Sequence, residues 1–210
     1  MKKKLFKLFK IGFVLFITFS IGGYMVIRNY WKKYIPATEI AKLVLEIKNA
    51  EHLPDVFYKL YEIEQSSSLN KDLTYRIWKE SITGNHASSP SNQVARISLI
   101  NNRLKTRDKR VKPYIEYSLA LKIEEETNQR ECLNWIAERY DFTHQVIGVK
   151  NLAFQIYAKE IDKLNERELA SVIIMMKNPM LYNPRKKNRL KLLNSEVDKL
   201  MKQYQERTLE

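Results

Sequence analysis

The hydrophobic and polar positions of the chain divide it into one apolar run and a long succession of amphipathic segments. The run from Ile11 to Ile27 carries no charge (IGFVLFITFSIGGYMVI), and its length is near the lower limit for a helix that crosses the roughly 30 Å hydrocarbon core of a bilayer. Beyond it, apolar residues recur every three to four positions, and no alternating stretch is long enough for a sheet. The pattern predicts a mainly α-helical domain behind one N-terminal transmembrane helix.

Breaker residues and apolar spacing place the helices of this domain. Ile40, Val44 and Ile47 mark the first, and Asn165 with Glu168 three residues later is typical of a capping box that starts a later one over 168–177. The other helices are predicted over 54–64, 69–82, 113–126, 130–140 and 146–159, and from about 91 and 186 onward. The chain then divides into a basic tail (1–10), a transmembrane signal-anchor helix (11–27), a juxtamembrane helical segment (28–52) and one domain (53–205).

Charge predicts the orientation of the apolar helix. Five lysines precede it without any acid, and three cations follow it: Lys2, Lys3, Lys4, Lys7 and Lys10 before, and Arg28, Lys32 and Lys33 after. Because the more basic flank stays inside, the N-terminus is predicted to be cytoplasmic and the domain to lie on the outer face.

A cleaved signal peptide is the alternative, since a basic region, an apolar region and small residues are all present. No A-x-A-like site follows the apolar run. Aromatic residues at its end (Tyr24, Tyr30, Trp31 and Tyr34) resemble an interfacial belt. These observations favour a retained anchor.

The charge of the remainder bounds the partners. The formal net charge is +13, and removing the five lysines of the tail leaves about +8. An exported domain does not meet nucleic acid, so anionic lipid head groups, phosphate-bearing lipids or anionic wall polymers are the expected partners. Cys132 is the single cysteine and cannot form an internal disulfide. A hydrophobic core must therefore hold the domain, and about 180 residues suffice for one.

Two glutamates are set apart by the helix faces they occupy. Glu64 follows Leu60 and Tyr61, an aromatic environment that would favour a general base, and Glu116 lies on an apolar stripe of its helix. A carboxylate on an apolar face has either a partner or a shifted pKa. The alternatives are that Glu64 is a frayed helix end and that the helix dipole alone favours Glu116.

Other candidate chemistry is limited to a basic cluster. Six cations lie between Arg103 and Lys112, just before a predicted helix that begins near Pro113. Such a cluster is usually a solvated face, but beside a helix N-terminus it also suits a diphosphate. The three histidines show no ligand spacing to one another or to Cys132, so no side-chain metal site is predicted.

Five segments match, in order, the motifs of one enzyme family. QVIGVKNLAFQIYAK (145–159) is similar to G-x-x-G-I-x-x-A-A-x-x-Y-F-G-K, LNERELASVI (164–173) to L-T-L-x-E-A-A-x-L-A, and KNPMLYNP (177–184) to K-A-P-x-x-Y-N-P. Upstream, EYSLALKIE (116–124) and SSPSNQVAR (88–96) resemble a catalytic-glutamate stretch and S-T-I-T-Q-Q-L-A-K. With these motifs the chain resembles the peptidoglycan glycosyltransferases, the lysozyme-like domain of monofunctional transglycosylases and class A penicillin-binding proteins.

The resemblance implies a bacterial inner-membrane enzyme that polymerises lipid II into glycan by inverting transfer, releasing undecaprenyl diphosphate. Glu64 would be the general base and Glu116 the second catalytic glutamate. Substrate contacts would come from Ser91, Asn92, Gln93, Arg96, Arg110, Lys112, Tyr182 and Asn183. The implied partners are lipid II, the growing glycan, the membrane and a separate transpeptidase. Use of a divalent cation such as Mg²⁺ is left open.

The family's first motif, E-D-x-x-F-x-x-H-x-G-x-D, is reduced here to Glu64, Gln65 and a serine run. This departure keeps a second hypothesis open. The chain could be a degenerate family member that binds cell-wall intermediates or acts as a membrane-anchored scaffold.

Overall fold

The computed structural model describes residues 2–65, 69–70, 73, 89–100, 112–143, 145–184 and 186–208, without the side chains of residues 2–9, 11, 100 and 112. The helices are α1 (Lys2–Asn29), α2 (Ala37–Lys48), α3 (Asp55–Glu64), α5 (Pro90–Ile100), α6 (Lys112–Glu126), α7 (Gln129–Arg139), α8 (Val149–Tyr157), α9 (Glu166–Lys177) and α10 (Lys187–Thr208), with 3-10 turns η1 (Tyr30–Lys33) and η2 (Ile161–Lys163). Within the described ranges, an isolated bridge between Asp141 and Ile147 is the one β feature. The mainly α fold predicted from the sequence is confirmed.

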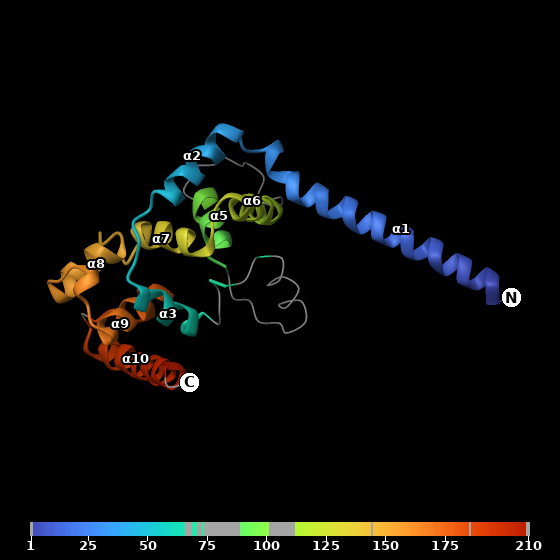
Figure 1. Ribbon diagram of the computed structural model, residues 1–210. Coiled ribbons are helices and arrows are strands. Elements are labelled where there is room, and N and C mark those ends of the chain that lie inside the picture. The colour runs from blue at the N-terminus through green and yellow to red at the C-terminus, as the bar shows by residue number, and fades with distance from the viewer. Residues whose placement is uncertain are drawn as a thin grey trace.

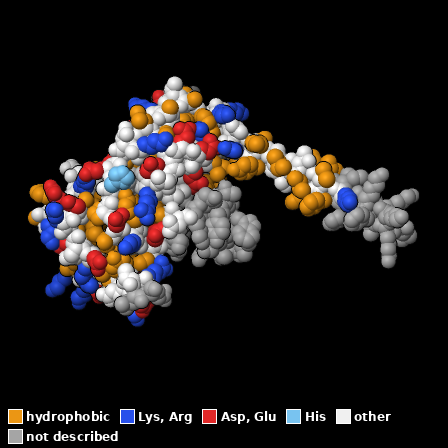
Figure 2. All heavy atoms as spheres, viewed as in Figure 1, with side chains coloured by type: hydrophobic (Ala, Val, Ile, Leu, Met, Phe, Trp, Pro, Cys, Tyr) orange, Lys and Arg blue, Asp and Glu red, His pale blue; other side chains and the backbone are white. Residues whose placement is uncertain are grey.

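Helix α1 extends away from the rest of the molecule as a single rod (Figure 1). The segment Gly12–Lys33 is long and apolar enough to cross a membrane. None of its most apolar 18-residue stretch is buried against the domain. Large apolar side chains are exposed along its described part, from Phe13 to Ile27 (Figure 2). Both features are compatible with the predicted anchor.

The juxtamembrane segment is packed into the domain. Helix α2 buries Ile40, Leu43, Val44 and Ile47, because these positions share one face of the helix, and they belong to the same hydrophobic core as the helices that follow. The residues predicted as a separate segment (28–52) therefore contribute to one continuous core.

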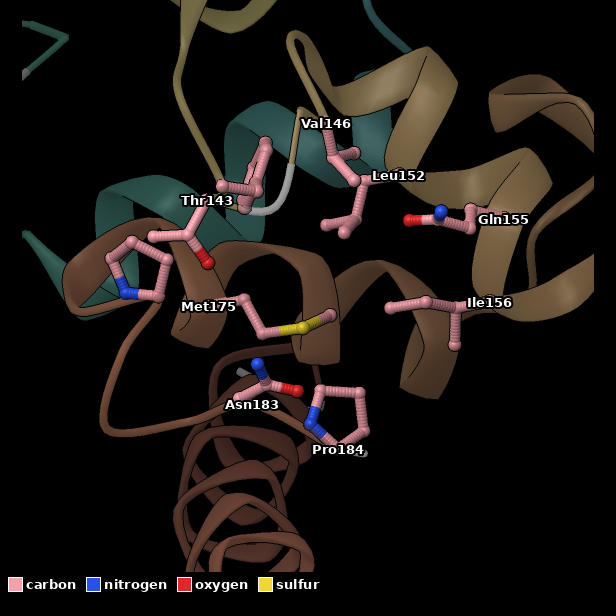
Figure 3. A pocket seen from close by; sticks show the side chains of 10 residues that line it. Thr143, Val146, Leu152, Gln155, Ile156, Met175, Asn183 and Pro184 are labelled. Carbon is pink, nitrogen blue, oxygen red and sulfur yellow. The ribbon is translucent and has the colours of Figure 1, made fainter. Parts of the chain in front are cut away.

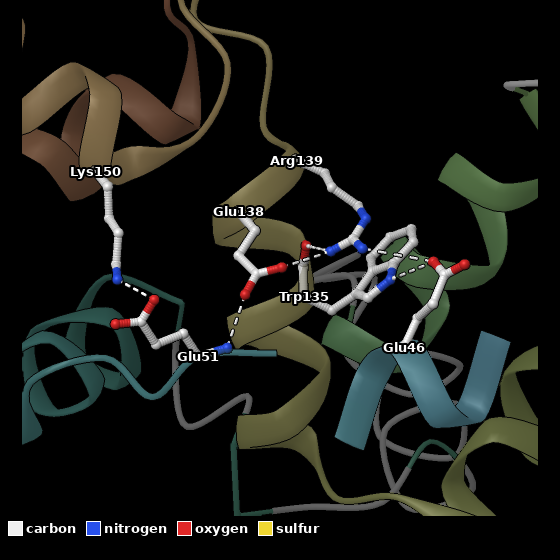
Figure 4. Close-up of polar contacts among 6 residues, drawn as sticks. All are labelled: Glu46, Glu51, Trp135, Glu138, Arg139 and Lys150. Atoms are coloured by element: carbon white, nitrogen blue, oxygen red, sulfur yellow. Dashed lines mark hydrogen bonds and ion pairs between the residues drawn. The ribbon is translucent and has the colours of Figure 1, made fainter. Parts of the chain in front are cut away.

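Polar contacts also hold the juxtamembrane segment (28–52) against α7 (Figure 4). Arg139 lies over the ring of Trp135, 4.6 Å from its centroid, and contacts Glu46 of α2 at 3.5 Å and Glu138 at 2.7 Å. Glu138 in turn accepts a hydrogen bond of 2.7 Å from the backbone N–H of Glu51. The last turn of α2 and the chain that directly follows it are thus held by charged groups of α7.

The predicted helices in the described ranges match the observed ones closely, with one instructive difference. The helix predicted from Val146 begins at Val149, because the bridge to Asp141 and a positive φ at Gly148 occupy the residues before it. The helix predicted over 69–82 lies mostly outside the described residues. The capping box of Asn165 and Glu168 is present.

Ala158 ends α8 in a left-handed conformation, with φ 53° and ψ 35°. The related family pattern has glycine there. A side chain in this region costs about 1–2 kcal/mol, partly offset because glycine loosens the unfolded chain. We therefore expect Ala158→Gly to raise the free energy of unfolding by about 0.5–1 kcal/mol, measured by thermal unfolding in detergent. Ala153→Gly, inside the same helix, should lower it, and a lower value for Ala158→Gly would contradict this interpretation.

Candidate active site

Glu64 ends α3 with its carboxylate held by a lysine of α9. Lys177 Nζ donates to Glu64 Oε1 at 2.6 Å, and the Glu64 side chain is only 13% exposed. The hydrogen bond to Glu64 raises the pKa of Lys177, with smaller contributions from nearby Tyr182 and Glu196, whereas burial acts in the opposite direction. The Glu64 carboxylate is therefore held in place by a positively charged partner, and Glu64 is not a frayed helix end. The predicted aromatic environment of Glu64 was an incomplete prediction, because the sequence did not indicate Lys177.

Glu116 has a cationic partner on the neighbouring helix. Arg96 Nε of α5 lies 3.4 Å from Glu116 Oε1, and the Glu116 side chain is 15% exposed while that of Arg96 is 57% exposed. Leu119, Ala120 and Ile123 of the same helix are fully buried. The carboxylate thus lies at the border of the core, and the guanidinium has free access to solvent on its other side.

A hydrogen bond between Gln93 and Tyr61 connects the two pairs. Gln93 Nε2 lies 3.4 Å from the Tyr61 hydroxyl. Tyr61 is one turn before Glu64 on α3, and Gln93 is one turn before Arg96 on α5, and residues three apart share a helix face. The side chains therefore follow one another from α9 across α3 and α5 to α6. We call this set the polar row: Lys177, Glu64, Tyr61, Gln93, Arg96 and Glu116.

Ser91 and Asn92 directly precede Gln93 of the polar row on α5, and Ser91 belongs to a buried network. Ser91 is fully buried, and its hydroxyl donates to Glu124 Oε1 at 2.6 Å. Glu124 also accepts hydrogen bonds from Gln129 and from the backbone N–H of Leu73. This network fixes the first turn of α5 and, through it, the positions of Gln93 and Arg96. Direct substrate contact by Ser91 and Asn92 stays a prediction.

Tyr182 and Asn183 lie in the loop between α9 and α10 and are both buried. Asn183 lines a cavity of about 30 Å³ together with Thr143, Met175 and Pro184 (Figure 3), which is room for about one water molecule. Tyr182 is close enough to Lys177 to contribute to its raised pKa. The loop thus meets the polar row at its Lys177 end.

The predicted diphosphate site is described only in part. Lys112 is the first residue of α6, and its side chain lies outside the described atoms. Arg110 lies outside the described residues. The N-terminus of α6 nevertheless places Lys112 one turn before Glu116.

The family model described as Transglycosylase matches residues 68–205. The chain belongs to the transglycosylase family. A search of curated proteins finds no match. The transglycosylase domain is lysozyme-like, and the family is that of the peptidoglycan glycosyltransferases.

The transglycosylase match covers most of the polar row. Gln93, Arg96, Glu116 and Lys177 fall inside it, whereas Glu64 lies four residues before its start. The structure therefore joins Glu64 to residues of the matched domain, through Lys177 on one side and Tyr61 on the other.

Two residues of the candidate site, Lys177 and Glu124, were not predicted from the sequence. Lys177 opens the KNPMLYNP segment and Glu124 closes EYSLALKIE, so both were in segments that carry the family resemblance. Their roles come from contacts 113 and 33 residues away along the chain.

No group of three His, Cys, Asp or Glu side chains suited to a metal ion occurs among the residues that the structure describes.

Proposed function

We propose that the chain polymerises lipid II into glycan strands by inverting glycosyl transfer, on the outer face of the bacterial cytoplasmic membrane. The observation that carries this proposal is the polar row, which joins Glu64 to Glu116 across three helices. A pair of carboxylates, each beside a cation, suits a reaction that moves one proton and releases an anionic leaving group.

Glu64 acts as the general base in this proposal. It removes the proton from the acceptor hydroxyl of lipid II while that oxygen attacks the anomeric carbon of the growing glycan. The bond from that carbon to the lipid diphosphate breaks, and the diphosphate leaves with the electron pair. Lys177 keeps the Glu64 carboxylate in place through the 2.6 Å hydrogen bond.

The leaving diphosphate meets the other end of the polar row. Arg96 is more than half exposed and would stabilise the developing charge by charge-assisted hydrogen bonds, with Lys112 and Arg110 as further predicted contacts. Glu116 orients Arg96 through their 3.4 Å contact.

A second candidate function has its own observation. The family match begins at residue 68, after Glu64, and the motif that supplies the family's base is reduced to Glu64 and Gln65. A degenerate member would bind lipid II or glycan and serve as a membrane-anchored scaffold, beside a separate transpeptidase.

The two functions are separated by incubating detergent-purified protein with fluorescent lipid II. We expect lipid II to be consumed by the wild type and much more slowly by Glu116→Gln. Bound lipid II that is never consumed would refute the enzyme and support the scaffold.

A further inference from the structure

The end of α1 is clamped to helix α6 at three positions. Arg28 Nε contacts Glu125 Oε1 at 2.6 Å. The Ser118 hydroxyl accepts a hydrogen bond of 2.9 Å from the Trp31 N–H and donates one of 3.3 Å to the Arg28 carbonyl. The rings of Tyr30 and Tyr114 meet edge to face, with centroids 6.3 Å apart. We call these contacts the α1–α6 clamp.

The clamp shows how the two helices cross. Tyr114, Ser118 and Glu125 are four and seven positions apart, so they share one face of α6. They span about 16 Å of that helix at 1.5 Å per residue. Their partners all lie within residues 28–31. Helix α6 therefore lies across the end of α1 and does not run along its length.

The centre of the clamp is dry and its edge is charged. Ser118 is fully buried, and Trp31 is 6% exposed. At the edge, burial raises the pKa of Glu125, but hydrogen bonds from Arg28 and Lys122 outweigh it and leave that pKa lowered. A buried hydrogen bond is costly to break without a replacement, so the α1–α6 clamp should hold α6 at a fixed position relative to α1.

That position corresponds to the surface of a bilayer. The uncharged run ends at Ile27, and the head-group layer extends about 5–7 Å beyond the hydrocarbon core on each side. Residues 28–31 follow within about 6 Å at helical rise. The residues of α6 that contact them must lie in the same layer.

The exposed side chains around the clamp suit that layer. Tyr114 is 62% exposed, and tyrosine is enriched at membrane interfaces. Lys32 and Lys33 are exposed, with their ammonium groups 5.8 Å and 5.6 Å from the ring centroids of Trp31 and Tyr34. Cations at this depth can bind anionic head groups, while the exposed ring of Tyr114 occupies the interface.

We propose that α6 is seated in the lipid head-group layer, with the exposed Tyr114, Lys32 and Lys33 as its contact surface for anionic phospholipids and the α1–α6 clamp fixing its height. The proposal rests on the proposed membrane anchoring of α1 and deepens the proposed function. Glu116 lies two residues before Ser118, so seating α6 holds the Glu116 end of the polar row at the level of a membrane-bound diphosphate.

Nitroxide labels at three positions test the seating in vesicles of phosphatidylcholine and phosphatidylglycerol. The variants are Tyr114→Cys on α6, Phe19→Cys on α1 and Phe154→Cys on α8, all at exposed positions, and α8 lies at the far end of the domain from α1 (Figure 1). Native Cys132 is buried, and burial raises its pKa to about 12, so it should escape labelling at neutral pH.

Collisions with lipid-soluble oxygen and with a water-soluble nickel chelate give the depth of each label. We expect the Phe19 label in the hydrocarbon core, the Tyr114 label at the interface and the Phe154 label in water. A Tyr114 label as aqueous as the Phe154 label would overturn the proposal, and so would an aqueous Phe19 label. Glycosyl transfer is not measured, so an inactive protein leaves this test intact.

Charge reversal then tests the clamp. In the Tyr114→Cys background, Arg28→Glu or Glu125→Arg should make the label aqueous, and the two together should restore its interfacial depth. Glu126→Arg is the matched control, because Glu126 pairs with Lys122 and not with Arg28. An unchanged depth in both single reversals would show that the clamp does not fix the height of α6.

Discussion

Replacing Glu64 by glutamine should slow lipid II polymerisation by at least about 100-fold, the lower range for loss of a general base. Glutamine keeps the shape of the side chain and can still accept the hydrogen bond from Lys177, but it cannot take a proton. The fold should therefore survive, and the loss should appear as a lower turnover rate with lipid II binding retained. The measurement is the initial rate of polymerisation at saturating lipid II.

Glu196→Gln is the matched control for this variant. Glu196 accepts a hydrogen bond of 2.6 Å from Lys199. It also contributes to the raised pKa of Lys177, but it is not part of the polar row. Its removal tests whether loss of any carboxylate near Lys177 slows the reaction. Equal polymerisation rates for Glu64→Gln and Glu196→Gln would show that Glu64 is not the general base.

Gly148→Ala should destabilise the domain by about 2–4 kcal/mol, the range for a side chain forced into a strained and crowded site. Gly148 has φ 83°, and a Cβ added there would lie 2.6 Å from the Glu138 carbonyl oxygen. The backbone cannot easily move away, because the Gly148 N–H donates to the Tyr140 carbonyl at 2.8 Å. This hydrogen bond joins the end of α7 to the start of α8.

Thermal unfolding in detergent measures the effect, at about 2–4 °C of midpoint per kcal/mol for a domain of this size. Gly22→Ala in α1 is the control, since a Cβ there meets nothing within 4 Å, and it should leave the domain transition unchanged. Similar midpoints for the wild type and Gly148→Ala would contradict the predicted strain.

Local patterns were enough to predict the fold. Apolar spacing located α2, α3, α6, α7 and α9 to within a few residues, and Asn165 with Glu168 located the start of α9. These features depend on residues a few positions apart, which is the range over which helix periodicity and capping act. The burial of α2 in the domain core was not predicted, because an amphipathic face does not reveal what covers it.

The candidate site was predicted less completely, because its contacts are distant in sequence. The pair of Glu64 and Lys177 joins residues 113 positions apart, and Gln93 reaches Tyr61 across 32 positions. The family resemblance implied substrate contact by Ser91, yet its side chain lies in the buried Glu124 network. Helix faces and the resemblance identified the two glutamates, and only the packing of helices could identify their partners.

Product analysis shows directly whether this chain makes glycan from lipid II. Wild-type protein in vesicles that contain lipid II should yield glycan strands longer than the starting disaccharide, with one undecaprenyl diphosphate released for each bond formed. Glu64→Gln should yield neither product. Intact lipid II, bound to well-folded wild-type protein after prolonged incubation, would show that the chain does not polymerise lipid II.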